Sequence, residues 1–413
     1  MPRTYRALAR TPEFTPFFLA AALRVGASTM SGLALAVLVY DRTRSPLLAA
    51  LSMFGPSFTQ LLGATVLLSA ADRTEPRAAL GRLAVLTALG TALMAAPGLP
   101  LWAAFAVLLA QGLADSLAGG VRYGLLTEIL PPEDYLLGRS LLAVCTGVTQ
   151  IAGYGLGGVL VTALSPHGAL LAAAGLSLAA ALALRLGLRR RPPRAGGRPS
   201  AAQTWRTNVT LFSDPSRRTL YLAMWVPNGL IVGCESLFVP FDPVHAGLLF
   251  GCSAAGMLVG DTVAGRFLAP RWRARLASPL RLLLAAPYLV FALHPGPVLA
   301  AAAVALAAVG YSAGLLMQER LVALIPDGTQ GQALGLHSAG MLTAQGLCAV
   351  LAGAVAQYTS ASVAMTALAT ASIVVTLVLE RGLRASRLRV RSLPSPSARA
   401  DPSPSPSPNP SPR

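Results

Sequence analysis

Lysine is absent from this 413-residue chain, in which all 33 basic residues are arginine. A P-loop that binds a nucleoside triphosphate needs a lysine in the pattern Gly-x-x-x-x-Gly-Lys-Ser/Thr, so the sequence excludes direct ATP drive through such a loop. Charge is also scarce, because 12% of the residues are charged while 54% are hydrophobic. A water-soluble domain carries about 25% charged residues. A soluble globular fold is therefore excluded.

Cysteine and histidine are few, and neither gathers in a pattern that binds a metal. Cys145, Cys234, Cys252 and Cys348 fall inside predicted helices without metal-type spacing, so we expect packing residues and neither a disulfide nor a metal. No cluster of His, Asp or Cys collects to do chemistry, which predicts that the chain is not an enzyme and holds no cofactor. The net charge of +17 is spread through short gaps and one linker. That distribution argues against a nucleic-acid partner.

Long apolar runs are what the sequence has in abundance. Crossing a bilayer takes about 20 mostly apolar residues in a helix, because lipid offers the backbone no hydrogen-bond partners. The runs predict an all-α membrane protein with twelve transmembrane helices in two six-helix bundles. The spans are expected at about 14–40, 46–71, 79–97, 101–127, 137–163, 168–188, 219–240, 245–268, 277–293, 297–318, 333–357 and 361–379.

The arginines predict which way the spans point. They gather in alternate gaps between the spans, and the intervening turns hold only Arg42 and Arg44. Positive residues favour the cytoplasmic side, so we expect both termini in the cytoplasm of a multi-pass plasma-membrane protein. The arginines before Phe14 resemble a secretion signal, but the apolar run that follows is too long and has no cleavage site. We interpret it as the first span.

Composition divides the chain into four parts. We expect a bundle at 1–188, a cytoplasmic linker at 189–218 rich in Arg, Pro, Gly and Ser, a second bundle at 219–384, and a disordered Ser/Pro-rich tail at 385–413. The halves share residues at a nearly constant offset, which favours a duplication of parallel repeats. Gly112 and Arg122 correspond to Gly310 and Arg320; Pro131, Gln150 and Gly158 correspond to Pro326, Gln345 and Gly353.

From about Arg10 to Arg384 the chain resembles the major facilitator superfamily. The stretch 69–77 is similar to that family's loop between spans two and three, with Asp72, Arg73 and Arg77 at matching positions. The resemblance implies that these three residues latch the cytoplasmic side during the transport cycle. Asp261, five residues before Arg266 in span eight, is expected to anchor the same gate, with a role in substrate binding as the alternative.

Glycines in span five resemble the family's antiporter motif. Gly153, Gly157 and Gly158 match it, while Tyr154 stands where the motif has proline. Glycines on one helix permit close approach to a neighbour and easy bending, and both roles remain open. The loop from Thr127 to Ser140 resembles the macrolide-exporter-like drug efflux branch.

Charges within the spans need a partner, a wet cavity or a function. In the resembled superfamily, spans one, four, seven and ten line a central cavity, so we expect Arg24 to pair with Asp115 there. Glu235 lies seven residues after Asn228, on the same helical face. It is expected either to bind a proton or a cationic substrate, or to be tied to a neighbouring helix. Further cavity candidates are Gln111, Trp225, Asn228 and Tyr311; Gln150 and Gln345 are expected to be structural hydrogen-bonders.

These features together predict a monomeric secondary transporter with alternating access, whose partners are a small-molecule substrate, protons and the lipid bilayer. The favoured activity is export of a hydrophobic or amphipathic compound by proton antiport, which would confer drug resistance. One alternative is uptake or facilitated movement of a small metabolite. Another is a membrane sensor that has the fold without transport.

Overall fold

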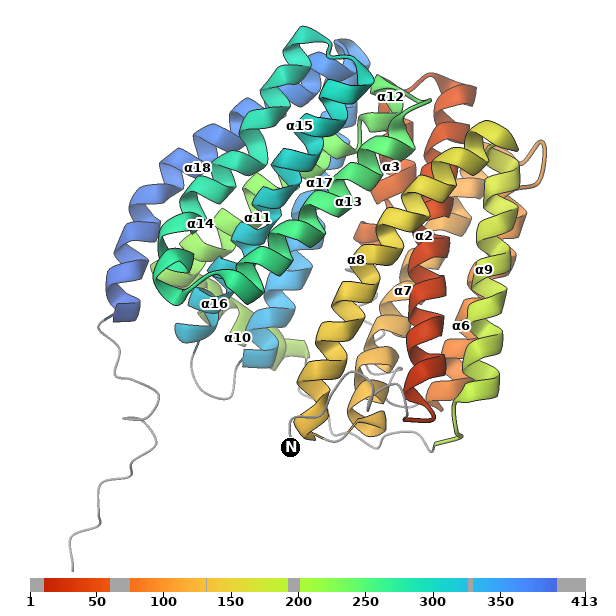
Figure 1. Cartoon of the computed structure of the whole chain (residues 1–413), viewed down its shortest axis with the longest axis horizontal. Coiled ribbons are helices and arrows are strands. Elements are labelled where there is room, and N and C mark those ends of the chain that lie inside the picture. Colours follow the sequence, from red (N-terminus) through yellow and green to blue (C-terminus); the bar gives the residue numbers. More distant parts are fainter. Residues whose placement is uncertain (1–10, 60–74, 131, 192–200, 326–329, 392–413) are drawn as a thin grey trace, which may run out of the picture.

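The computed structural model describes residues 11–59, 75–130, 132–191, 201–325 and 330–391, and the secondary structure of these residues is helical (Figure 1). The first bundle contains α2 (Phe14–Thr43), α3 (Pro46–Phe54), α6 (Pro76–Met94), α7 (Leu101–Ile129), α8 (Pro132–Ala163) and α9 (Pro166–Gly187). The linker contains α10 (Ala201–Ser213). The second bundle contains α11 (Pro215–Glu235), α12 (Phe238–Phe241), α13 (Ala246–Thr262), η1 (Val263–Phe267), α14 (Pro270–Ala285), η2 (Ala286–Leu293), α15 (Pro297–Val309), η3 (Gly310–Ser312), α16 (Ala313–Ala323), α17 (Gln330–Tyr358) and α18 (Ala361–Arg391).

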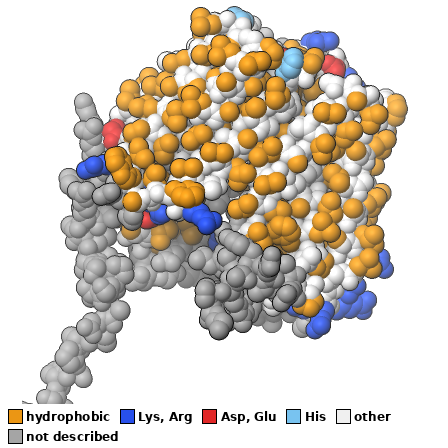
Figure 2. Space-filling model, in the orientation of Figure 1, with side chains coloured by type: hydrophobic (Ala, Val, Ile, Leu, Met, Phe, Trp, Pro, Cys, Tyr) orange, Lys and Arg blue, Asp and Glu red, His pale blue; other side chains and the backbone are white. Residues whose placement is uncertain are grey.

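Eleven segments of the described chain are long and apolar enough to cross a membrane. They correspond to all the predicted spans except 46–71, of which residues 60–71 lie outside the described residues. The all-α membrane fold is therefore confirmed. Figure 2 shows hydrophobic side chains across the visible sides of the bundles, with arginines toward the ends. Residues such as Leu86 (60% exposed) and Leu182 (56% exposed) form this surface, which is the surface that lipid requires.

Proline and small polar residues set the helix starts. Pro46, Pro166 and Pro215 each occupy the first turn of a helix, where the missing N–H has no intrahelical partner to lose. The residue before each proline caps the same turn: the Ser45 hydroxyl accepts from the Leu48 N–H at 3.3 Å and Ser165 from Gly168 at 3.3 Å. These spans therefore begin at a proline that follows a small polar residue.

Four spans predicted as single helices, the seventh to the tenth, change helix type or are interrupted, and the ninth and tenth show why. The ninth changes from α14 to the 3₁₀-helix η2 beside Pro287, which cannot donate a backbone hydrogen bond. The tenth changes from α15 to α16 through η3 at Gly310, where a Cβ would lie 2.5 Å from the Leu280 carbonyl oxygen. Only glycine allows these two spans to approach so closely.

The bundles meet along two seams, α8 against α13 and α3 against α17. In the first, a Cβ on Gly247 would lie 2.7 Å from the Cα of Gly158. In the second, a Cβ on Gly353 would lie 2.7 Å from the Cα of Leu47. Gly158 and Gly353 are one of the pairs assigned to the duplication, so the two seams reuse the same position in each repeat.

The contacts between bundles concentrate at the end opposite the linker. There the Ser45 hydroxyl donates to the Gln357 side chain at 2.7 Å, and the Tyr40 hydroxyl donates to the Pro240 carbonyl at 3.5 Å. Figure 1 shows α8 and α13 close together at the top and diverging toward the bottom, which is the end that holds the linker helix α10. The structure is thus closed at the end opposite the linker.

The linker and the C-terminal boundary contain more helix than composition predicts. Helix α10 lies within the predicted connector, and α18 continues to Arg391, past the predicted bundle boundary at residue 384. The remaining tail, 392–413, lies outside the described residues.

Candidate functional site

The predicted ion pair between the first and fourth spans is present. Arg24 on α2 donates through Nη1 to Asp115 Oδ1 on α7 at 2.6 Å. The two side chains remain 31% and 26% exposed. They are thus paired but still reachable from the spaces on either side of them.

One of these spaces, the apolar chamber, lies toward the linker end and contains about 580 Å³ of empty space including its opening. Its lining comes entirely from the first bundle, with Arg24 and Asp115 at one end. The walls are largely Phe17, Ala20, Leu80, Leu83, Ala118 and Leu184. Apart from Arg122, which also lines the chamber, such a surface accommodates hydrocarbon and offers few hydrogen bonds.

The other space, the polar chamber, lies toward the opposite end and contains about 800 Å³ of empty space including its opening. It too is lined by the first bundle alone and includes Arg24, Asp115, Thr87 and Ser177, which the apolar chamber also contacts. Its remaining polar lining includes Ser28, Ser31, Ser52, Ser57, Thr91 and Gln111. The two chambers therefore meet at the ion pair, with opposite chemical character.

Gln111 is a wall of the polar chamber, as well as a contact between two helices. Its Nε2 donates to the Thr87 carbonyl at 3.0 Å and to the Thr91 hydroxyl at 3.1 Å, both on α6. These bonds hold α7 against α6 and orient the amide. Gln111 therefore lines this chamber of the first bundle, and its role in a substrate pathway stays a prediction.

Glu235 occupies a different place, at the end of α11 inside the second bundle. Its side chain is buried and accepts a hydrogen bond from the Ser253 hydroxyl of α13 at 2.6 Å. The hydroxyls of Tyr288 and Tyr311 face the same carboxyl group, although the Tyr311 hydroxyl has no partner within normal hydrogen-bond geometry. Tyr154, from α8 of the first bundle, stacks on Phe250 at 4.9 Å beside this cage. No basic side chain among the described residues pairs with Glu235.

Asn228 and Trp225 belong neither to the lining of the two chambers nor to the residues around Glu235. Asn228 accepts from Gln345 Nε2 at 2.9 Å, so the predicted structural role of Gln345 is confirmed, with Asn228 as its partner. Trp225 Nε1 donates to the His337 carbonyl at 3.0 Å. Asn228 and Glu235 thus contact different helices, α17 and α13, despite their helical spacing. The structure divides the predicted pathway residues between the two bundles and does not bring them into one pocket.

Only three of the five residues predicted to form the cytoplasmic gate, Arg77, Asp261 and Arg266, are among the described residues. Asp72 and Arg73 lie outside the described residues. Arg77 Nη2 donates to the Arg185 carbonyl, which joins α6 to α9 within one bundle. No ion pair joins Asp261 to Arg266 in the described part of the chain. The backbone around η1 is instead held by Arg273, which donates to the carbonyls of Leu268 (2.9 Å) and Gly265 (3.0 Å).

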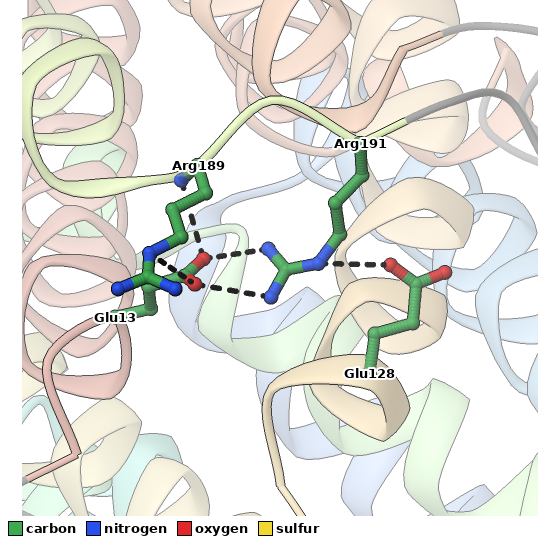
Figure 3. A network of polar contacts seen from close by, with 4 residues as sticks. All are labelled: Glu13, Glu128, Arg189 and Arg191. Atoms are coloured by element: carbon green, nitrogen blue, oxygen red, sulfur yellow. Dashed lines mark hydrogen bonds and ion pairs between the residues drawn. The ribbon is translucent and has the colours of Figure 1, made fainter.

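A charged network that sequence reasoning missed lies at the linker end of the first bundle (Figure 3). Arg191 contacts both carboxylate oxygens of Glu13, at 2.5 and 3.1 Å, and its Nε lies 3.5 Å from Glu128. The Arg189 N–H donates to Glu13 at 3.2 Å. Burial raises the pKa of Glu13, but these hydrogen bonds and charges lower it by more than burial raises it. The net pKa is therefore below its ordinary 4.5. The network fixes the start of the linker to α2 and α7.

The glycines of α8 serve close packing. A Cβ on Gly153 would collide with the Thr29 hydroxyl, and one on Gly157 would lie 3.3 Å from the Cα of Met30, both on α2. Gly158 faces the other bundle. Bending of α8 at these residues stays a prediction.

Arg281 is a further charge that sequence reasoning missed. It is 2% exposed, lies in the predicted span 277–293, and its Nη2 is 3.4 Å from Glu380 on α18. Its position within an apolar run was the signal, because a buried arginine requires a partner. Ser253 and Tyr288, around Glu235, carried no comparable signal.

Comparison with known proteins gives a family match. The sequence model described as Major Facilitator Superfamily matches residues 17–312. No curated protein sequence matches the chain significantly.

Solved structures of transporters share the fold. A mutant of the nucleoside transporter NupG is 14% identical, with a TM-score of 0.73 over 89% of this chain and 99% of that one. The peptide transporter POT in complex with sulfate is 13% identical, with a TM-score of 0.72 over 94% and 96%. A bacterial homologue of the human lysosomal transporter Spinster, inward-facing and occupied, is 14% identical, with a TM-score of 0.71 over 96% and 100%.

Proposed function

The chain belongs to the major facilitator superfamily, and from this premise we propose that it is a secondary transporter that exports a hydrophobic or amphipathic small molecule by proton antiport. The observation that carries the proposal is the pair of chambers in the first bundle that meet at Arg24 and Asp115. An amphipathic compound has an apolar part that suits the apolar chamber and a polar part that suits the polar chamber. Export, drug resistance and the macrolide-exporter-like branch belong to the same proposal.

Glu235 is the acid that we assign to proton binding. An ionised carboxylate in an apolar interior without a cationic partner costs several kcal/mol, and protonation removes that cost. Its hydrogen-bond partner Ser253 is on α13, one of the helices that contact the first bundle. Loss or gain of the proton therefore acts on a helix of the seam between bundles.

Alternating access supplies the transport cycle. The described state is closed at the end opposite the linker, by contacts such as Ser45 to Gln357. Export requires these contacts to break so that the chambers open to that side. Arg24 and Asp115 on α2 and α7 hold the two helices together between the chambers, and we assign to them substrate binding during this change.

The first experiment is accumulation of a panel of dyes and antibiotics in cells with and without the full-length protein, repeated with an uncoupler. Lower accumulation that an uncoupler restores supports proton-driven export. Export that the uncoupler leaves unchanged contradicts the proton claim. No effect on any compound favours the alternative in which the protein is a sensor without transport.

Variants test the two sites separately. We expect Arg24→Asp or Asp115→Arg alone to abolish export and the double exchange to restore part of it, because only the exchange keeps an ion pair. Arg82→Gln, which removes an exposed arginine of α6 outside both chambers, is the matched control. Equal loss in the single and double variants would contradict a role for the pair. Glu235→Gln should abolish uphill export while leaving exchange of substrate down its gradient.

The second candidate is uptake or facilitated movement of a polar metabolite. It is favoured by the hydroxyl-lined polar chamber, and two of the structures with this fold are described as a nucleoside transporter and a peptide transporter. Cells that make the protein would then accumulate the labelled metabolite instead of losing it, which distinguishes this activity from export.

A further inference from the structure

Helix α10 of the linker is held at the level where two membrane spans begin. It ends at Ser213, and Asp214 caps the next helix by accepting from the N–H groups of Ser216 and Arg217 at 3.0 and 3.1 Å. Arg217 in turn donates through Nε to the Leu211 carbonyl at 3.1 Å. These bonds fix the last turn of α10 directly against the first turn of α11.

A second attachment fixes the middle of α10 to the start of another span. Asn208 accepts from Gln332 Nε2 at 3.1 Å, and the apolar part of α17 begins at that glutamine. Leu211 is 2% exposed, and the Phe212 ring stacks on Trp225 of α11 with the centroids 5.9 Å apart. Because both attachments are at the ends of spans, α10 lies along the boundary of the membrane, at the lower edge of the second bundle in Figure 1.

One side of α10 is exposed among the residues that the structure describes. Trp205 is 70% exposed and Val209 is 51% exposed. They are four residues apart and therefore adjacent on the helix surface. Arg206 beside them and Arg218 at the start of α11 are exposed as well. An exposed apolar pair with an exposed arginine next to it in the chain is ill suited to water but matches the layer of lipid headgroups.

The boundary is marked independently on the neighbouring spans. Phe267, at the end of η1, is 73% exposed, and Trp272, in the first turn of α14, is 46% exposed. Exposed aromatic residues at span ends are typical of the interface between water and lipid, because their rings combine an apolar body with a polar edge. Trp205 continues this group of interfacial rings onto the linker.

We propose that α10 is a membrane-surface helix that inserts Trp205 and Val209 among the lipid headgroups and binds the phosphates of anionic phospholipids through Arg206 and Arg218. The partner of this surface is an anionic leaflet, because arginine donors match phosphate oxygens and the net charge of +17 has the complementary sign. The inference does not depend on transport, so it stands or falls separately from the proposed export activity.

The test uses the full-length protein in nanodiscs of phosphatidylcholine, with or without phosphatidylglycerol. Quenching of tryptophan fluorescence by lipids brominated high on the acyl chain is compared between the parent and Trp205→Phe, and the difference isolates Trp205. We expect strong quenching by the brominated lipids and little by aqueous iodide. Arg206→Gln should lower the apparent affinity for phosphatidylglycerol about fivefold.

Arg44→Gln is the matched control, because it removes one exposed arginine at the opposite end of the molecule. It should leave the Trp205 signal unchanged. Quenching of Trp205 by iodide alone would overturn the proposal, since the residue would then face water. A Trp205 signal that neither quencher reaches would also overturn it, because another protein segment would then cover the helix. Quenching by lipid that does not depend on phosphatidylglycerol would overturn the phosphate contact.

Discussion

At the scale of single residues, the interior of the second bundle depends on Arg281, a buried charge within the apolar run of the ninth span. Arg281 donates through Nη2 to the Thr376 carbonyl at 3.2 Å and lies 3.4 Å from Glu380. The Ser278 hydroxyl donates to the same carboxylate. A buried pair contributes little over a well-packed apolar alternative, but the loss of one partner leaves a charge that the interior cannot solvate.

Glu380→Ala should therefore destabilise the protein by about 3–5 kcal/mol, because it leaves Arg281 without its carboxylate. The measurement is the midpoint of thermal unfolding in detergent, monitored by the loss of the folded protein's peak in size-exclusion chromatography. Arg82→Gln, an exposed arginine on α6, should change the midpoint little. Equal midpoints for the two variants would show that the pair does not support the bundle.

The ion pair and the cage of Glu235 show how much of the site is predictable. Arg24 and Asp115 are rare charges at similar depth in spans that the resemblance places around one cavity, so their pairing follows from the sequence. The partners of Glu235 do not follow, because Ser253 and Tyr288 are ordinary residues whose positions depend on how α13 and η2 pack. That the pathway residues of the second bundle line neither chamber was also beyond sequence reasoning, since helical spacing gives a direction and no partner.

At the scale of helices, hydropathy locates the spans and proline locates their starts. The predicted span 168–188 and the observed α9 (Pro166–Gly187) differ by two residues or fewer at each end. The change to η2 at Pro287 was not predicted, because the surrounding run is apolar throughout. Helix α10 was not predicted because its polar composition resembles a connector, although Leu211 and Phe212 provide a buried side.

Gly310→Ala should damage the packing of the tenth span against the ninth. The added Cβ would lie 2.5 Å from the Leu284 nitrogen and from the Leu280 carbonyl, both backbone atoms that cannot rotate away. Overpacking of this kind costs about 1–3 kcal/mol. Gly314→Ala, four residues later with open space around the new Cβ, is the control. The midpoints of thermal unfolding of the two variants give the comparison. A Gly310→Ala midpoint equal to that of the parent would contradict the close approach.

The attachment of the linker to α2 should depend on pH. Because the pKa of Glu13 is lowered in the folded protein, the network is fully formed above the ordinary carboxyl value of 4.5 and is lost as the pH falls through the lower, folded value. Parent protein should therefore lose protection against proteolysis in the linker as the solution is acidified below about pH 4.5. Glu13→Gln should be cleaved at a similar rate at all these pH values, because it cannot form the ion pairs.

Glu319→Gln provides the comparison for that experiment. Glu319 is 59% exposed and lies 3.6 Å from Arg273, so its pair contributes about 0–1 kcal/mol. The linker of this variant should follow the parent in its response to acid. A linker that is cleaved at the same rate in parent and Glu13→Gln at neutral pH would contradict the role of the network.

At the scale of the whole molecule, the duplication seen in sequence becomes a property of the seams. Gly158 meets α13 and Gly353 meets α3, so equivalent positions of the repeats allow the bundles to touch at two places. The offset of 195 residues in the sequence indicated the repeat. It did not indicate which end of the molecule is closed, because both states of an alternating transporter contain the same sequence.

Gly247→Val should shift the molecule away from the state closed opposite the linker. Any Cβ at this position would lie 2.7 Å from the Cα of Gly158 and 2.9 Å from the Tyr154 carbonyl oxygen. A penalty of about 1–3 kcal/mol on the closed state alone changes its population relative to the open state about 5- to 150-fold. Both bundles remain intact, because the collision is between them.

Cross-linking reports this shift directly. Ser45 and Gln357 touch across the closed end, with 2.7 Å between Oγ and Oε1, so Ser45→Cys with Gln357→Cys should be joined by a short bifunctional thiol cross-linker in the parent background. Gly247→Val should lower the cross-linked fraction. Gly251→Ala, one turn along α13, would place its Cβ 3.9 Å from the Ile151 carbonyl and should leave the fraction unchanged. If Gly247→Val folds and cross-links like the parent, the contact of the two glycines does not control closure, and the closed end must be held by Tyr40, Ser45 and their partners.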